Sequence, residues 1–135
     1  MSAVLVDTGP LVALLDRSDE AHGECEAALR TLPTPLLTVW PVLAEAMYLL
    51  GEWEPQDALW RWIEDGSVTI LPLGPEDVPR IRELMTKYRD RPMDLADAAL
   101  VRVAERERIR RVFTLDRRDF LVYRALRKEK FSIVP

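Results

Sequence analysis

Residues 4–15 read VLVDTGPLVALL, a stretch in which one carboxylate, Asp7, separates two apolar runs. The first run, Val4–Val6, is short and rich in β-branched residues, which is typical of a buried strand. Pro10 opens the second run, and proline is favoured in the first turn of a helix. The stretch therefore predicts a strand that ends at Asp7 and a helix that begins near Pro10.

Further short apolar runs predict four more strands, at Leu36–Val39, Val68–Leu71, Val112–Leu115 and Phe131–Val134. Helical patterns lie between them, near residues 19–31, 41–51, 55–65, 75–89 and 94–108. Strands that alternate with helices favour a mostly parallel sheet with helices on both faces. We therefore expect a three-layer α/β/α fold of about five strands, formed by residues 1–135 as a single domain.

The composition excludes several classes of protein. The single cysteine, Cys25, cannot form an intramolecular disulfide, and with the single histidine, His22, it cannot complete a tetrahedral zinc site. No stretch approaches the roughly 20 apolar residues of a membrane span, and the N-terminus lacks the basic region of an export signal. We therefore expect a cytoplasmic protein that does not contact a membrane.

The charge is distributed unevenly along the chain, although the net charge is only -4. Residues 1–79 hold 3 Lys/Arg and 14 Asp/Glu, whereas residues 80–135 hold 16 and 9. A basic half can attract a polyanion even when the whole protein is acidic, because the local potential steers the encounter. The alternative is that the arginines form solvated helix faces.

Glu45 is the one charged residue between Arg30 and Glu52, in a helical stretch that is otherwise apolar. A helix that is apolar all round is typically buried, and a buried carboxylate must be protonated, paired or bound to a metal. We therefore expect a positive group beside Glu45. The alternative is a glutamate at the rim of the helix that reaches solvent.

Asp94 and Asp97 lie three residues apart and therefore on one face of the predicted helix. Asp94 is equally well explained as the residue that caps this helix. Small and apolar neighbours surround Asp97, so we expect a functional role for its carboxylate.

Asp116 follows a predicted strand directly, as Asp7 does. Ligand sites of open α/β sheets form beyond the carboxyl ends of the strands, although an aspartate there can also close a turn. Carboxylates from four segments would repel one another in one crevice, by about 4 kcal/mol for each close pair, unless a cation binds them. Oxygen ligands suit Mg²⁺ or Mn²⁺, so the pattern indicates metal-dependent hydrolysis of phosphodiesters.

These motifs together resemble a known family. Its carriers here are VLVDTGPLVALL at 4–15, Glu45 in its apolar helix, MDLADA at 93–98 and TLDRRDF at 114–120. The chain resembles PIN domains and, in its compact length, the VapC-type ribonuclease toxins of toxin–antitoxin pairs. The resemblance implies that the acidic quartet Asp7, Glu45, Asp97 and Asp116 binds Mg²⁺ or Mn²⁺ and carries the catalysis. It also places Asp94 and Asp119 at acidic positions that vary within the family and have supporting roles. The hydroxyls of Thr8 and Thr114 would orient carboxylates or a metal-bound water.

The same resemblance implies an RNA substrate, a cognate antitoxin and a homodimer. Arg117 and Arg118 are the best candidates for RNA binding, because they adjoin Asp116; pairing with Asp119 or with the antitoxin is the alternative. Further arginines that are candidates for RNA contact are Arg102, Arg106, Arg108, Arg110 and Arg111. Trp60 and Trp62 suit either an interface or the core.

Other activities stay open at this point. A PIN-like fold also suits a housekeeping nuclease or a catalytically silent RNA-binding module. A phosphatase with Asp7 as the nucleophile is less well supported, because Gly9 stands where that chemistry has a second aspartate. Half of an aspartic protease would fit Asp-Thr-Gly at 7–9, but such proteases are nearly all β.

Overall fold

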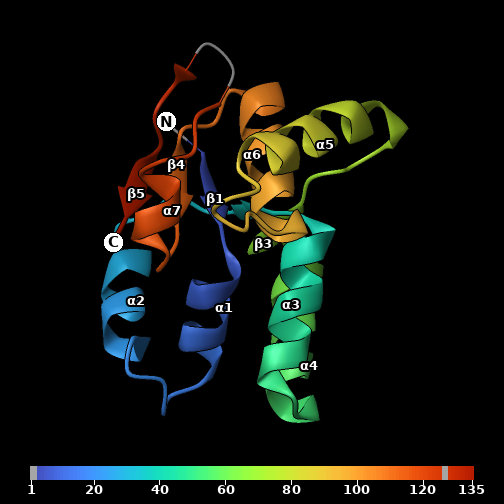
Figure 1. Cartoon of the computed structure of the whole chain (residues 1–135). Coiled ribbons are helices and arrows are strands. Elements are labelled where there is room, and N and C mark those ends of the chain that lie inside the picture. Colours follow the sequence, from blue (N-terminus) through green and yellow to red (C-terminus); the bar gives the residue numbers. More distant parts are fainter. Residues whose placement is uncertain (1–2, 126–127) are drawn as a thin grey trace.

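The computed structural model describes residues 3–125 and 128–135, and it contains a five-stranded sheet in the order β3-β2-β1-β4-β5. All four strand pairs are parallel (Figure 1). The strands are β1 (Val4–Val6), β2 (Leu36–Thr38), β3 (Val68–Ile70), β4 (Arg111–Phe113) and β5 (Ser132–Val134). The helices are α1 (Thr8–Leu15), α2 (His22–Leu29), α3 (Trp40–Leu50), α4 (Trp53–Glu64), the 3₁₀ helix η1 (Pro75–Asp77), α5 (Val78–Lys87), α6 (Leu95–Glu107) and α7 (Arg117–Phe120).

The strand order explains the layers. Connections between parallel strands are right-handed, so the reversal of direction after β3 sends the later helices to the opposite face of the sheet. The helices before β3 pack together, with α1 against α2, α3 and α4, while α5 packs against α6. The predicted α/β fold with a parallel sheet of five strands is confirmed.

The central strand β1 positions the site. Val4, Leu5 and Val6 are fully buried, as expected for a strand covered on both faces. Val6 pairs in register with Phe113 of β4, so the residues that follow these two strands emerge side by side. Asp7 and Thr114 therefore lie side by side at the carboxyl ends of β1 and β4.

The helices differ from the predictions mainly at their ends. The first helix begins at Thr8 rather than near Pro10, because Asp7 caps it. The predicted helix at 75–89 begins with the 3₁₀ turn η1, and the four-residue α7 was not predicted. None of the helices in the described ranges combines the length and the apolar character that crossing a bilayer requires.

Helix α3 corrects one prediction. It is not buried all round: Trp40 and Leu49 are exposed, and the side chain of Tyr48 is 84% exposed. Its neighbours α1, α4 and α6 cover part of its circumference and leave an apolar stripe in solvent. Trp62 packs against the core, whereas Trp60 stays partly exposed.

Arg102 and Arg106 are committed to a structural contact and are not free for RNA. Asp77 is fully buried, and its Oδ1 accepts from Arg102 Nε at 2.7 Å while its Oδ2 accepts from Arg106 Nη1 at 3.0 Å. The backbone N–H of Gly74 donates to the same Oδ2 at 2.8 Å. These bonds join η1, which leads directly into α5, to α6. Arg110 likewise pairs with a carboxylate, that of Glu129, at 2.7 Å.

Candidate metal centre

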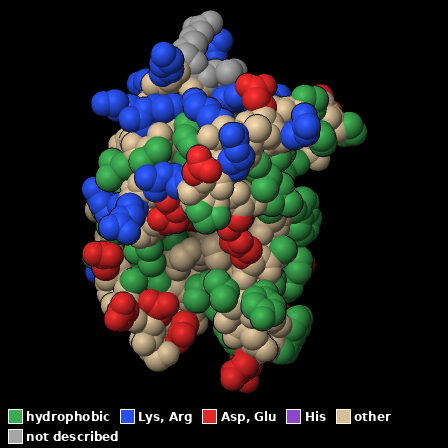
Figure 2. Space-filling model, in the orientation of Figure 1, with side chains coloured by type: hydrophobic (Ala, Val, Ile, Leu, Met, Phe, Trp, Pro, Cys, Tyr) green, Lys and Arg blue, Asp and Glu red, His purple; other side chains and the backbone are tan. Residues whose placement is uncertain are grey.

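A pocket of about 530 Å³ opens at the carboxyl ends of β1 and β4. Figure 2 shows acidic side chains around a hollow on one face of the molecule, with Lys and Arg side chains gathered above it. The residues that line the pocket are Asp7, Thr8, Gly9, Glu45, Leu49, Pro92, Asp94, Asp97, Leu115, Asp116 and Asp119. All four acids of the predicted quartet therefore face one pocket, together with both supporting aspartates.

Asp7 is held by bonds to both of its carboxylate oxygens. Oδ1 accepts from the backbone N–H of Thr8, and Oδ2 accepts from the hydroxyl of Thr114, each at 2.8 Å. Its own N–H donates to Phe113 at 2.9 Å and so extends the ladder between β1 and β4. Burial raises the pKa of this carboxyl above its ordinary value. The predicted role of Thr114 in orienting a carboxylate is consistent with this geometry.

Asp97 lies in the first turn of α6 and is almost fully buried. Its Oδ2 accepts from the hydroxyl of Tyr123 at 2.9 Å, and its backbone N–H donates to Asp94 at 2.9 Å. Asp94 is thus the cap of α6, the alternative that the sequence left open. Burial, and then the negative charges of Asp7 and Asp94, raise the pKa of Asp97 to about 8.

Tyr123 is a site residue that sequence reasoning missed. It is fully buried, and its ring makes edge contacts with Tyr88 and Phe120, at centroid distances of 5.1 and 5.2 Å. The hydroxyl reaches Asp97 across 26 positions of sequence. An isolated tyrosine after a short unpredicted helix gives no sequence signal of such a contact.

Glu45 projects from α3 toward the start of α1. Its Oε1 accepts from the hydroxyl of Thr8 at 2.9 Å. Partial burial raises its pKa, and the charges of Asp94 and Asp7 add to this. Among the described residues no Lys or Arg forms an ion pair with Glu45, so a positive neighbour supplied by the chain is not found, and the alternative of a bound metal stays a prediction.

Asp116 lies at the exposed rim of the pocket and caps α7. Its backbone N–H donates to Thr114 Oγ1 at 2.9 Å, so one threonine hydroxyl joins Asp116 to Asp7. Desolvation of its carboxylate raises the pKa of Asp116 to about 6. The side-chain hydrogen bond with Asp119 and the negative charge of Asp119 add to this shift.

Asp119 stands closer to the buried acids than the sequence suggested. One carboxylate oxygen from each of Asp97, Asp116 and Asp119 lies within 4.8 Å of the others. Asp7 and Glu45 line the same pocket but are not part of this tight group. A set of carboxylate oxygens, without nitrogen or sulfur, fits a hard divalent cation such as Mg²⁺ or Mn²⁺. Burial first, and then the neighbouring negative charges, raise the pKa values of Asp7, Asp97 and Asp116, and a bound cation would favour their ionised forms.

The arginines near the pocket differ in their contacts. Arg117 donates to the carbonyl of Pro135 at 2.6 Å, and Arg118 is exposed on α7. Neither pairs with Asp119, which instead accepts from Arg91 at 2.8 Å. Arg91 was also missed by the sequence analysis, because its loop carried no recognised motif.

Comparison with known proteins gives a match to a family model, a curated relative and two solved structures with a similar fold. The family model described as PIN domain matches residues 4–126. A curated protein, Ribonuclease VapC26 of Mycobacterium tuberculosis (strain ATCC 25618 / H37Rv), is 29% identical over 135 residues, which are 98% of this chain and 100% of that protein.

Two solved structures share the fold. The crystal structure of Mycobacterium tuberculosis VapC20, a Sarcin-Ricin loop cleaving toxin, aligns with a TM-score of 0.76 at 21% identity, over 84% of this chain and 92% of that one. A toxin–antitoxin complex from Klebsiella pneumoniae aligns with a TM-score of 0.70 at 20% identity, over 89% and 92%.

Proposed function

Because the chain belongs to the PIN domain family, we propose that it is a Mg²⁺- or Mn²⁺-dependent endoribonuclease and the toxin of a toxin–antitoxin pair. The observation that carries this proposal is the pocket at the ends of β1 and β4, into which four separate segments bring carboxylates. Ribonuclease VapC26, matched over nearly its whole length, supports RNA as the substrate. We further propose that residues 1–135 act as one nuclease domain in the cytoplasm.

In this proposal the acidic quartet Asp7, Glu45, Asp97 and Asp116 holds the metal. When bound, a divalent ion would lower the pKa of water and would neutralise the negative charge that develops on a phosphodiester. The chain's own groups supply the orientation. The hydroxyl of Thr114 donates to the Asp7 carboxylate and accepts from the backbone N–H of Asp116, and the hydroxyl of Thr8 donates to the Glu45 carboxylate.

Tyr123 has a positioning role in the same arrangement. Its bond to Oδ2 of Asp97 fixes the direction of this carboxylate, as outer partners of metal ligands commonly do. The carboxylates must lose their protons before a metal binds, so the raised pKa values make metal binding and cleavage increase with pH. Arg117 and Arg118, beside Asp116, would contact the RNA backbone at the rim.

The experiment that tests this function compares Asp7→Asn and Asp97→Asn with the parent chain. We expect cleavage of single-stranded and looped RNA in Mg²⁺ to fall by more than about 100-fold, beyond the loss typical of an outer partner of a metal ligand. Asp57→Asn is the matched control, because Asp57 pairs with Arg61 on the surface of α4. Calorimetric titration with Mg²⁺ measures the loss of the metal site directly.

Two results would contradict the proposal. Quartet variants that cleave RNA as fast as the parent would exclude a metal-dependent nuclease at this pocket. A parent chain that binds RNA and Mg²⁺ without cleavage would instead indicate an RNA-binding module.

We propose two protein partners as well, a cognate antitoxin and a second copy of this chain. The toxin–antitoxin complex whose fold this chain shares supports the first. An apolar surface supports the second, and it consists of two stripes that flank α6. Trp40, Ala44 and Tyr48 form one stripe along α3, and Val78, Ile81 and Met85 form the other along α5.

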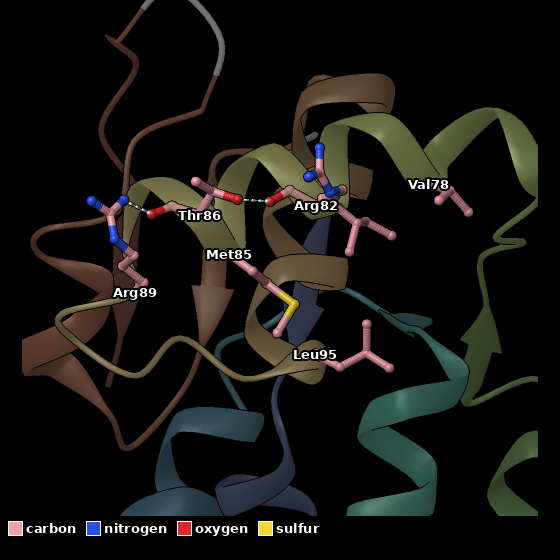
Figure 3. A pocket seen from close by; sticks show the side chains of 7 residues that line it. Val78, Arg82, Met85, Thr86, Arg89 and Leu95 are labelled. Atoms are coloured by element: carbon pink, nitrogen blue, oxygen red, sulfur yellow. Dashed lines mark hydrogen bonds between the residues drawn. The ribbon is translucent and has the colours of Figure 1, made fainter.

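The second stripe borders a groove of about 570 Å³ between α5 and the start of α6. Figure 3 shows Met85 extending from α5 toward the start of α6, where Leu95 lies, with Arg82 and Arg89 on opposite sides of Met85. Exposed apolar patches of this kind mark protein interfaces, and a stable dimer covers about 800 Å² of each partner.

Sedimentation velocity tests the dimer. Tyr48→Glu and Met85→Glu should each shift the chain toward the monomer, because each introduces a charge into an apolar contact. Glu24→Lys on α2, away from both stripes, should leave the mass unchanged. A parent chain that stays monomeric at all accessible concentrations would contradict the dimer.

A further inference from the structure

Arg91 brings a positive charge to the edge of the acidic pocket. Its Nη1 lies 2.8 Å from Oδ1 of Asp119, and Asp119 belongs to the tight acidic group with Asp97 and Asp116. About a third of the Arg91 side chain, 34%, is exposed to solvent. A guanidinium carries five N–H donors, and the bond to Asp119 engages one of them. The side chain is thus partly open to solvent, and its guanidinium has further donors with which to bind a second anion.

The loop that carries Arg91 is fixed to the same framework as the pocket. The backbone N–H of Arg91 donates to the carbonyl of Tyr88 at 2.9 Å. Tyr88 in turn packs edge-on against Tyr123, whose hydroxyl holds Asp97. The next residue, Pro92, lines the pocket itself. Arg91 is consequently held in a set position relative to the buried carboxylates.

The charge of the pocket makes an arginine at this position useful. Six carboxylates line the pocket, and they repel a phosphate backbone that approaches their bound metal. Arginine binds carboxylate and phosphate in the same planar geometry, so a guanidinium that already points at a carboxylate presents donors suited to phosphate.

We propose that Arg91 binds a phosphate of the RNA backbone at the mouth of the pocket, and that Asp119 orients its guanidinium for this contact. This proposal rests on the proposed ribonuclease function and adds a substrate-binding residue to it. It assigns to Asp119 a positioning role through Arg91, which Arg117 and Arg118 do not share, because neither pairs with Asp119.

The test measures RNA binding and RNA cleavage for Arg91→Ala, Arg91→Lys and the parent. Binding is followed over a range of salt concentrations with a labelled single-stranded RNA, and cleavage is followed in Mg²⁺. We expect Arg91→Ala to weaken binding and raise KM by about tenfold, with kcat within about twofold, since one phosphate contact is lost. The slope of log affinity against log salt should fall by about 0.7.

Arg91→Lys should recover part of the affinity and most of the salt slope, because it keeps the charge and loses the planar fork. Arg61→Ala is the matched control: Arg61 also pairs with an aspartate, Asp57 at 2.9 Å, but Asp57 lies on α4 and, unlike Asp119, does not line the pocket. This control should match the parent in KM and in salt slope. Thermal unfolding of each variant verifies that the fold is intact.

Three outcomes would overturn the proposal. An unchanged KM and salt slope in Arg91→Ala would do so while the ribonuclease function stands. Tighter Mg²⁺ binding in Arg91→Ala with an unchanged slope would assign Arg91 to restraining Asp119 rather than to RNA. A parent chain that neither binds nor cleaves RNA would remove the proposed function and, with it, this contact.

Discussion

Asp77 and Asp97 are both aspartates with little or no exposed surface, yet the chain treats their charges in opposite ways. Asp77 is fully buried and accepts bonds from Arg102, Arg106 and the backbone of Gly74. Asp97 accepts from the neutral hydroxyl of Tyr123, and its pKa rises to about 8. Around Asp77 the protein itself supplies the positive charge. To the carboxylate of Asp97 the described residues supply none, so a positive charge would have to come from a bound ligand.

The contrast distinguishes a structural carboxylate from one suited to a ligand. A buried ion pair with its hydrogen bonds satisfied joins helices firmly, here η1 to α6. A group of carboxylates without such partners destabilises the chain by mutual repulsion, and a cation of two charges removes that repulsion. Four predictions test this distinction.

The largest effect is expected where the buried ion pairs of Asp77 are broken. Asp77→Asn leaves Arg102 without its negative partner and leaves Arg106 with that of Glu107 alone, and we expect a loss of about 3 kcal/mol of unfolding free energy. Urea denaturation measures it. The control Asp57→Asn, in an exposed pair on one helix, should cost about 0.5 kcal/mol or less. Equal losses in the two variants would contradict the structural role of Asp77.

Addition of Mg²⁺ should have the next largest effect. At a concentration about 100 times its dissociation constant, a ligand that binds only the folded chain adds about 2.7 kcal/mol of stability. We expect this gain at pH 8, a smaller gain at pH 5 where protons compete for the carboxylates, and little gain in Asp97→Asn. Thermal unfolding with and without Mg²⁺ measures it, and an equal gain in Asp97→Asn would contradict the site.

The pH dependence of the metal-free chain gives a third test. The pKa of Asp97 is about 8 in the folded chain and 3.8 in its ordinary state, so between these values the folded chain keeps a proton that the unfolded chain releases. The stability that this proton contributes to the folded chain is therefore fully present below about pH 4. It is lost as pH rises toward 8, by up to about 1.4 kcal/mol for each pH unit. The raised pKa values of Asp7, Glu45 and Asp116 act in the same direction.

Denaturation in EDTA from pH 5 to pH 8 measures this slope. Asp97→Asn should flatten it, because the amide does not titrate. A stability that is constant or rises with pH in the metal-free parent would show that Asp97 is ionised without a cation, and the contrast with Asp77 would be lost.

The smallest effect is expected for Tyr123→Phe. The substitution removes the hydroxyl that donates to Asp97 and leaves the aromatic contacts with Tyr88 and Phe120 in place. We expect about 1 kcal/mol lower stability and roughly tenfold weaker Mg²⁺ binding, as for other outer partners of metal ligands. Calorimetric titration measures the second quantity, and an unchanged affinity would exclude a positioning role.

Local sequence patterns predicted the sheet and most of the acidic residues of the pocket at the carboxyl ends of its strands. All five strands appear within two residues of their predicted bounds, because buried parallel strands are continuous apolar runs between turn residues. Asp7 and Asp116 were recognisable as charges directly after such runs, and Asp97 as a charge among small apolar neighbours. These signals reside in a few consecutive residues.

Contacts between distant segments could not be predicted in this way. Arg91 meets Asp119 across 28 positions, and Arg102 meets Asp77 across 25, so nothing local separates these arginines from solvated ones. Glu45 was expected beside a cation because its helix was assumed to be covered all round. The helix is partly exposed, and the chain offers Glu45 the hydroxyl of Thr8 rather than an arginine or a lysine, which leaves the cation to the proposed metal.

The central claim is that the carboxylates at the ends of β1 and β4 form a divalent-metal site. Anomalous diffraction from crystals of this protein soaked in Mn²⁺ tests it most directly. We predict an anomalous peak in the pocket about 2.1 Å from carboxylate oxygens of the acidic quartet. A pocket without a peak at millimolar Mn²⁺, with these side chains bonded to arginines instead, would contradict the claim.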